Sequence, residues 1–274
     1  MNVPENAPKG KMGSVLAEIL AGTRARLPEL RQRRGDLEGA AARRPTPPSF
    51  HDALSPGPTL KLIAEVKRRS PSGGDIARGL DPVAHAKAYA AAGASVVSVL
   101  TEPAHFGGSI DDLAAVVADI PLPVLRKDFI VDELQLVEAR AMGAAAVLLI
   151  VRALGAVQLR SLLTTCAALE LGALVEAHTA AEVELALDAG ASVIGINSRD
   201  LDDLSIDRSA AWALLARIPA GRVAVAESAI GSADDAELAA VAGADAVLVG
   251  SALSRAARPE ALAASIIGVR RRGR

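Results

Sequence analysis

The sequence has few of the residues that would indicate a secreted or a nucleic-acid-binding protein. Cys166 is its only cysteine, which excludes an intrachain disulfide and favours a reducing compartment. Leucine and alanine surround Cys166, so we interpret it as a buried thiol rather than a nucleophile. The formal net charge is only −2 over 274 residues, which gives no bulk attraction to nucleic acid. We therefore expect no nucleic-acid partner.

Long apolar runs are also missing. The longest, Ala144–Val151, has eight residues, whereas a helix that spans a bilayer needs about 20. The first ten residues, MNVPENAPKG, are polar and lack the apolar segment of a secretion signal. These features predict a cytoplasmic protein with no membrane partner, and residues 1–12 as a disordered or loose arm. Hydrophobic residues still make up 51% of the chain, enough for a substantial core.

A repeated unit runs through the chain from Leu60 onward. In each copy a helical pattern ends near a glycine, and a short apolar strand follows, as a left-handed helix C-cap predicts. The glycines are Gly93, Gly143, Gly172, Gly190 and Gly243. Three more apolar segments, Leu60–Val66, Pro123–Arg126 and Arg222–Glu227, bring the predicted strands to eight, with helices between them.

Apolar strands that alternate with helices are typical of a parallel sheet covered by helices. Eight units in this length predict a single (β/α)8 TIM barrel over residues 51–268. A doubly wound open sheet is the alternative, but its Gly-x-Gly-x-x-Gly fingerprint is absent. Residues 1–50 have a helical pattern over Ser14–Arg34 and too little apolar material to fold alone, so we expect an N-terminal helical extension packed on the barrel. Residues 269–274 form a basic tail, which we expect to be solvated.

The stretch Leu60–Gly74, LKLIAEVKRRSPSGG, carries the first functional signal. Alternation along the strand places Glu65 and Lys67 on the same inner face, near its C-terminal end. Buried charges are costly unless they are paired, although an ordinary ion pair at the rim would also fit. The small residues that follow, Ser70–Gly74, allow a loop whose N–H groups approach an anion. We interpret this stretch as one wall of an active site.

In a (β/α)8 barrel the active site lies at the C-terminal ends of the strands. Polar residues leave most of the predicted strands at that end: Glu65, Lys67, Lys127, Asp128, Glu176, His178, Asn197, Arg199, Glu227 and Ser228. One charged strand end is ordinary, but so many on one face predict a catalytic site. Two of the few aromatic residues, Phe106 and Phe129, lie in the adjoining loops and suggest a planar ligand.

Two features suggest that the ligand carries a phosphate. Gly250 and Ser251 open the helix after the eighth strand, where backbone N–H groups attract anions, although a simple helix cap would need no ligand. Phosphate sites recur at this place in the fold, and Ser70 is a candidate to complete the site. The four histidines lie on separate elements without ligand spacing, so we expect no metal.

Several segments together resemble the indole-3-glycerol phosphate synthase family. They are IAEVKRRSPSGG, VLTEPAHFGGS, PVLRKDFIVDE, LVEAHT, GINSRDL, AESAI and VLVGSAL, and the likeness covers nearly the whole chain. The resemblance implies conversion of 1-(2-carboxyphenylamino)-1-deoxyribulose 5-phosphate to indole-3-glycerol phosphate in tryptophan biosynthesis. Ring closure would be followed by loss of CO₂ and water, with no cofactor. It also implies that the N-terminal extension folds over the barrel mouth.

The resemblance further implies roles for the polar residues. Lys127 matches the general acid, and we expect burial or Lys67 to lower its pKa towards neutrality. Lys67 would hold the substrate carboxylate, Glu176 would be the general base, and Glu65 would assist proton transfer and dehydration. The positions matched to substrate binding are Asn197, Arg199 and Ser228, with Phe106 and Phe129 at the aromatic ring. Those matched to the phosphate are Ser70, Gly250 and Ser251.

The sequence departs from the family pattern at two positions. Ala229 stands where the family usually has glycine, and its methyl group would crowd a phosphate-binding turn unless φ is negative there. Gly73 stands where the family often has lysine, which removes a loop charge.

Two other functions stay open. One is a non-catalytic barrel that binds a phosphate ligand, although the matching catalytic positions are all filled. The other is phosphoribosylanthranilate isomerase, which typically relies on a Cys/Asp pair, whereas Cys166 lies in a helical pattern. Whichever function holds, we expect a monomer or a weak homodimer.

Overall fold

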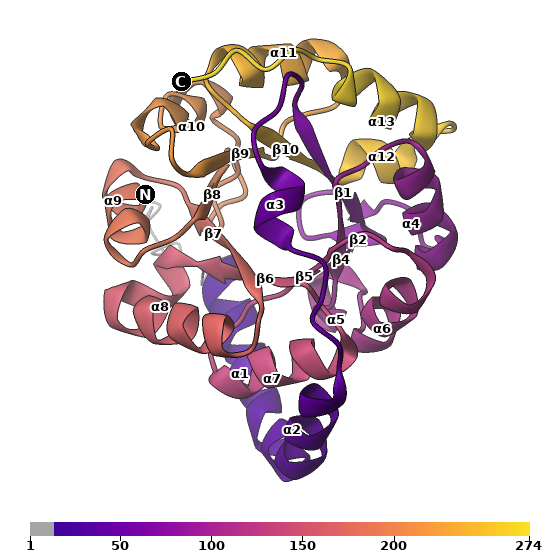
Figure 1. Cartoon of the computed structure of the whole chain (residues 1–274), viewed down its shortest axis with the longest axis vertical. Coiled ribbons are helices and arrows are strands. Elements are labelled where there is room, and N and C mark those ends of the chain that lie inside the picture. The colour runs from indigo at the N-terminus through magenta and orange to yellow at the C-terminus, as the bar shows by residue number, and fades with distance from the viewer. Residues whose placement is uncertain (1–13) are drawn as a thin grey trace, which may run out of the picture.

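Eight parallel strands close into a barrel in this computed structural model, which describes residues 14–274 (Figure 1). The predicted N-terminal arm, residues 1–12, lies outside the described residues. The strands are β1 (Lys61–Val66), β4 (Val96–Leu100), β5 (Val124–Lys127), β6 (Ala146–Ile150), β7 (Gly172–Ala177), β8 (Val193–Asn197), β9 (Val223–Glu227) and β10 (Ala246–Val249). β10 pairs with β1, which closes the barrel. The (β/α)8 prediction is confirmed, and the open-sheet alternative is wrong.

Helices surround the barrel much as the periodicity predicts. They include α4 (Pro82–Ala91), α6 (Ile110–Asp119), α7 (Glu133–Met142), α8 (Val151–Ala168), α9 (Ala180–Asp188), α10 (Arg208–Trp212), α11 (Ala233–Val241) and α13 (Pro259–Ile267). Two shorter helices, α5 (Pro103–Phe106) and α12 (Ser251–Arg255), follow β4 and β10. α8 begins at the end of β6, earlier than expected, and Gly155 interrupts it with φ 69° and ψ 173°.

The glycine junctions have two different causes. Gly93, Gly143, Gly190 and Gly243 have positive φ, as a left-handed helix end requires. Gly172 does not, and the left-handed residue there is Glu170 instead. A Cβ atom on Gly172 would lie 2.7 Å from the Cβ of Phe50, so this glycine is needed for close packing. The interpretation of Gly172 as a C-cap is therefore wrong.

The N-terminal extension, predicted as residues 1–50, contains α1 (Val15–Gln32) and α2 (Arg34–Arg43), and α3 (Phe50–Leu54) follows at the predicted boundary with the barrel. α1 begins beside the loop after β8, where the Leu16 N–H donates to the Leu201 carbonyl at 3.1 Å. α2 lies outside α7, and α3 lies across the end of the barrel at which β7 begins (Figure 1). The sequence did not predict α2, because its buried apolar residues are few.

The basic tail is packed rather than solvated, so that expectation is wrong. Asp245, at the start of β10, is completely buried. The guanidinium groups of Arg271 and Arg274 contact its two oxygens at 2.5 and 2.7 Å. Paired in this way, a buried carboxylate is tolerated. None of the helices within residues 14–274 is both long and apolar enough to cross a bilayer.

Candidate active site

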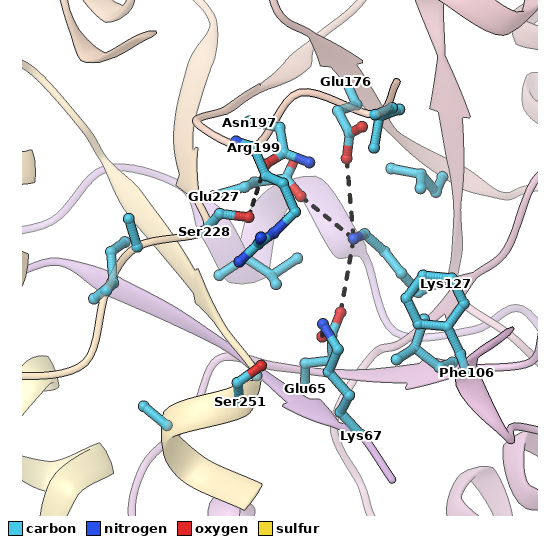
Figure 2. Close-up of a pocket in the computed structure, with 18 of the residues that line it drawn as sticks. Glu65, Lys67, Phe106, Lys127, Glu176, Asn197, Arg199, Glu227, Ser228 and Ser251 are labelled. Carbon is cyan, nitrogen blue, oxygen red and sulfur yellow. Dashed lines mark hydrogen bonds and ion pairs between the residues drawn. The ribbon is translucent and has the colours of Figure 1, made fainter. Parts of the chain in front are cut away.

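A cavity of about 400 Å³ opens at the C-terminal ends of the strands. All eight strands contribute to its wall, through side chains such as Leu100, Leu148 and Leu248 between the polar ones. Glu65, Lys67, Lys127 and Glu176 all line it. The four predicted catalytic residues therefore lie in one place, as their phase along the strands predicts (Figure 2).

Lys127 lies at the centre of the charged groups. Its Nζ is 3.5 Å from Glu227 Oε2, 3.7 Å from Glu65 Oε2 and 3.9 Å from Glu176 Oε2 (Figure 2). Lys67 Nζ lies 3.3 Å from the other oxygen of Glu65. Five ionisable groups from four strands or strand ends thus form one cluster, which can donate and accept protons across a small ligand.

The expected lowering of the Lys127 pKa is wrong. Burial does lower it, but the charges of Glu65, Glu227 and Glu176 outweigh burial, and the pKa is raised. Lys127 is therefore held as an ammonium, the form that an acid needs. Lys67 is not a principal neighbour of Lys127, because it pairs with Glu65 instead.

The buried carboxylates differ in their protonation. Burial raises the pKa of Glu65, but the charges of Lys67 and Lys127 lower it by more than burial raises it, so the net change is downward. Burial and the charge of Glu176 raise the pKa of Glu227 to about 8, against the opposing effect of Lys127. Near neutral pH the cluster therefore contains a carboxylate and a carboxylic acid on the two sides of Lys127.

Glu227 is the functional residue that sequence reasoning missed. The sequence places it among the polar strand ends but does not predict a role for it. The available signal was its phase, because Val223, Val225 and Glu227 alternate along β9. A Cβ atom on Gly195 would lie 2.0 Å from Glu227 Oε1, so the glycine of the neighbouring strand makes room for this carboxylate.

Asn197, Arg199 and Ser228 form one side of the cavity. The Ser228 hydroxyl donates to Asn197 Oδ1 at 2.7 Å, and the Arg199 N–H donates to the same oxygen at 3.0 Å. The Arg199 guanidinium donates to the Leu204 carbonyl at 2.9 Å, while burial lowers the pKa of Arg199. These bonds hold three predicted binding residues in fixed positions around the opening.

The turn after β9 is left-handed at two residues that are not glycine. Ser228 has φ 64° and Ala229 has φ 55°. The alternative that a negative φ absorbs the extra methyl group of Ala229 is therefore wrong. This conformation is costly for an alanine, so the departure from the family pattern places strain beside the cavity.

The two predicted aromatic residues lie together. The ring centroids of Phe106 and Phe129 are 6.1 Å apart, and both side chains line the cavity. Lys67 Nζ is 5.7 Å from the Phe106 centroid, within the range of a cation–π contact. Glu102 fixes α5, because its carboxylate accepts the N–H groups of Ala104, His105 and Phe106.

The predicted phosphate residues are only partly brought together. Gly250 and Ser251 line the cavity, and Figure 2 shows Ser251 on the side opposite Glu176. Ser70 does not line it, and its hydroxyl accepts the Gly73 N–H at 3.0 Å. Gly250 also has a steric role that the sequence did not predict, since a Cβ atom there would lie 2.3 Å from Glu65 Oε1. Arg255, from the last turn of α12, lines the same end of the cavity.

Proteins with known names are similar to this chain over most of its length. A model of the indole-3-glycerol phosphate synthase family matches residues 16–266. The chain belongs to this family. The prediction of an indole-3-glycerol phosphate synthase, a carboxy-lyase of tryptophan biosynthesis that acts on a phosphorylated small molecule, is thereby confirmed.

Curated relatives agree over nearly their whole length. Indole-3-glycerol phosphate synthase 2 of Streptomyces coelicolor is 47% identical over 259 residues, covering 94% of this chain and 100% of the relative. The indole-3-glycerol phosphate synthase of Streptomyces griseus is 48% identical over 256 residues, covering 93% and 95%. That of Leifsonia xyli is 47% identical over 244 residues, covering 87% and 93%.

Solved structures agree on the fold alone. A 3-hexulose-6-phosphate synthase matches with a TM-score of 0.61 at 18% identity, covering 76% of this chain and 98% of that one. A thiamine phosphate pyrophosphorylase from Pyrococcus furiosus matches with a TM-score of 0.57 at 16% identity, covering 76% and 93%. At such low identity these likenesses support the barrel and say nothing about the substrate.

Proposed function

We propose that this cavity binds 1-(2-carboxyphenylamino)-1-deoxyribulose 5-phosphate and converts it to indole-3-glycerol phosphate. The observation that carries the proposal is the position of Lys127, whose ammonium lies within 4 Å of Glu65, Glu176 and Glu227 in a cavity of about 400 Å³. Proton transfers and charge stabilisation are enough for this reaction, so the chain's own side chains supply the chemistry.

Lys127 acts in the ring-closing step. The ring carbon that carries the substrate carboxylate attacks the ketone carbon, and the ketone oxygen gains negative charge. Lys127 donates a proton to that oxygen and stabilises the charge as it forms. Lys67 holds the carboxylate until the C–C bond to CO₂ breaks, and the electrons of that bond restore the aromatic ring.

Glu176 and Glu65 act in the dehydration. The hydroxyl formed from the ketone leaves as water once it has been protonated, and Glu65 assists that proton transfer through Lys127. Glu176 takes the proton from the neighbouring carbon, which completes the double bond of the indole. Overall the substrate loses one CO₂ and one H₂O. Two protons are donated, one to the ketone oxygen and one to the leaving hydroxyl, and one returns from carbon, so the cluster takes up one proton from solvent in each turnover.

The other residues orient the substrate. Phe106 and Phe129 contact its aromatic ring, and Asn197, Arg199 and Ser228 bind its hydroxyls and carboxylate. The N–H groups of Gly250 and Ser251 bind the phosphate, and Arg255 adds a positive charge at that end of the cavity. Ser70 contributes through its loop, whose small residues can approach the same anion.

The test is turnover of the authentic substrate by the purified protein. We expect indole-3-glycerol phosphate to form together with CO₂, and Glu176→Gln to lower kcat by about 10²- to 10⁴-fold. Glu260→Gln, at an exposed carboxylate of α13, is the matched control and should leave kcat unchanged. Absence of product at millimolar substrate would support the non-catalytic barrel instead.

The isomerase alternative has no observation in its favour. Cys166 is buried in α8, and burial raises the pKa of its thiol to about 12, which makes it unreactive.

We further propose that the enzyme works in the cytoplasm, where such a thiol stays reduced. We also propose that it is a monomer or a weak homodimer. Sedimentation at micromolar concentration tests the oligomeric part.

A further inference from the structure

His178 lies directly behind the proposed base. It follows the end of β7 and, two residues after Glu176, is on the same inward side of the strand. Its side chain is only 4% exposed, and it does not line the cavity. Its Nε2 is 3.6 Å from Glu176 Oε1, and its Nδ1 is 3.4 Å from Glu182 Oε2. The imidazole thus lies between two carboxylates.

Glu182 is itself held in place. It lies in the first turn of α9, where its carboxylate accepts the backbone N–H of His178 at 2.7 Å and Arg152 Nε at 3.2 Å. Arg152, at the start of α8, also contacts Asp200 at 3.1 Å in the loop after β8. Alternating charges therefore run from the mouth loop through Arg152, Glu182 and His178 to Glu176.

We propose that His178 is a positioning residue: its ring, which lies between Glu182 and Glu176, fixes the Glu176 carboxylate opposite Lys127. This inference rests on the role of Glu176 as the base. Each oxygen of Glu176 then has its own cation, because Oε2 faces Lys127 at 3.9 Å and Oε1 faces His178 at 3.6 Å. These two ion-pair contacts favour the orientation in which the carboxylate faces Lys127.

The charges around His178 favour its protonated form. Burial lowers its pKa, but the close contact with Glu182 and the charges of Glu176 and Glu182 raise it more, with Arg152 opposing. The net change is upward. The charge of the imidazolium in turn lowers the pKa of Glu227 on β9. The groups that face His178 thus come from β7, α9, α8 and β9, and most of them are anionic.

An imidazolium at this position also adds to the positive charge around the cluster. Because Glu227 is largely protonated near neutral pH, the negative charge comes from the other carboxyl groups, while Lys67 and Lys127 bring two positive charges. The proposed substrate adds a phosphate and a carboxylate. His178 lies behind Glu176 and does not line the cavity, so its charge acts on the base more than on the ligand.

The pH dependence of kcat tests this role. Removing a cation beside a carboxylate raises the pKa of that carboxylate, so the base becomes inactive at a higher pH. We expect His178→Gln to move the acid limb of the kcat profile upward by about one pH unit. The loss of kcat should be about 10-fold on the acid side and smaller at pH 8, while KM changes little. Glu182→Gln should shift the limb in the same direction by less.

The matched control is His51→Gln, an exposed histidine of α3 at the other end of the barrel, which should leave the profile unchanged. ¹⁵N spectra of the wild-type histidine rings give a second readout. The signal that is missing in His178→Gln should show an imidazolium at pH 7. If the glutamine variant does not fold, the Glu182→Gln profile and the titration of the wild-type rings decide.

The possible failures can be told apart. An equal loss of kcat at every pH, an unchanged profile, or a neutral His178 ring at pH 7 would overturn the positioning role. Full turnover by Glu176→Gln would instead overturn the proposed base, whatever His178 does.

Discussion

At the scale of single residues, the site depends on how closely carboxylates can be packed around one ammonium. Gly195 and Gly250 leave room for Glu227 and Glu65, since a Cβ atom on either would lie within 2.3 Å of a carboxylate oxygen. Lys127 offsets their repulsion, and its raised pKa reflects that. The cluster is therefore stabilised by Lys127 and strained by any additional negative charge.

Glu227 makes stability depend on pH. Its pKa is about 8 in the folded protein, against an ordinary value of 4.5. Between these values the unfolded chain releases a proton that the folded protein keeps, so the free energy of unfolding falls as pH rises through this window. Glu227→Gln keeps the shape without the proton. We expect it to be more stable than wild type by about 1–3 kcal/mol at pH 8, and similar to it at pH 4.5.

Urea unfolding at the two pH values measures this difference, and activity at pH 8 should fall in the same variant. A stability difference that does not change with pH would contradict the account.

Replacing Ala229 by glycine, the usual residue of the family, should stabilise the protein. At φ 55° its methyl group costs roughly 1 kcal/mol, so Ala229→Gly should raise the free energy of unfolding by about that amount and leave turnover intact. Ala92→Gly, at an ordinary helical φ of −75°, is the control and should lose stability. Thermal unfolding of both variants is the measurement; destabilisation by Ala229→Gly would show that the turn is not strained.

The sequence could identify most site residues but not their electrostatics. Strand phase and family resemblance together placed Glu65, Lys67, Lys127 and Glu176 in one pocket. The predicted direction of the Lys127 pKa shift is wrong, because the shift depends on the distances to three carboxylates and no sequence pattern supplies those distances. Ser70 was likewise expected in the site, but a hydrogen bond within its own loop engages its hydroxyl.

At the scale of elements, the short helix α5 carries Phe106 to the cavity. The buried carboxylate of Glu102 caps α5 by accepting three backbone N–H groups. Glu102→Ala should lower the free energy of unfolding by about 1–2 kcal/mol and raise KM several-fold, because Phe106 loses its fixed position. Ser49→Ala removes the N-cap of α3 at the other end of the barrel, and it should cost similar stability without changing KM.

Steady-state kinetics of these two variants, with denaturation curves, separate the effect on Phe106 from the loss of a cap. Equal KM values in both variants would show that α5 does not contribute to substrate binding.

Element boundaries were predicted less well than element types. Gly155 interrupts α8, whose first residues follow directly from β6, and Pro259 begins α13 after a break. Single residues therefore divide helical segments at places that local periodicity does not show. α2 was missed because Leu37 and Ala41 bury against Leu134 of α7, a tertiary contact rather than a local pattern. Local periodicity predicts an element only when that element carries enough apolar residues of its own.

At the scale of the whole molecule, chemistry and stability lie at opposite ends of the barrel. The catalytic cluster is at the C-terminal ends of the strands, whereas Asp245 and its two arginines lie at the start of β10. This division is typical of the fold. A change at Asp245 should therefore affect stability without affecting turnover.

Asp245→Ala leaves Arg271 and Arg274 without their buried partner. We expect the free energy of unfolding to fall by about 3–5 kcal/mol, with kcat of the folded enzyme unchanged. Asp234→Ala, at an exposed aspartate of α11, should cost less than about 1 kcal/mol. Calorimetry and turnover at 25 °C test both variants, and a large loss of kcat in folded Asp245→Ala would contradict the separation of the two ends.

The central claim is that one ammonium, surrounded by carboxylates, donates the proton that closes the indole ring. The most direct measurement is kcat for the carboxyphenylamino-deoxyribulose phosphate with Lys127→Ala that has a native circular dichroism spectrum. The account predicts a loss of about 10³-fold or more. Turnover within about threefold of wild type would contradict it.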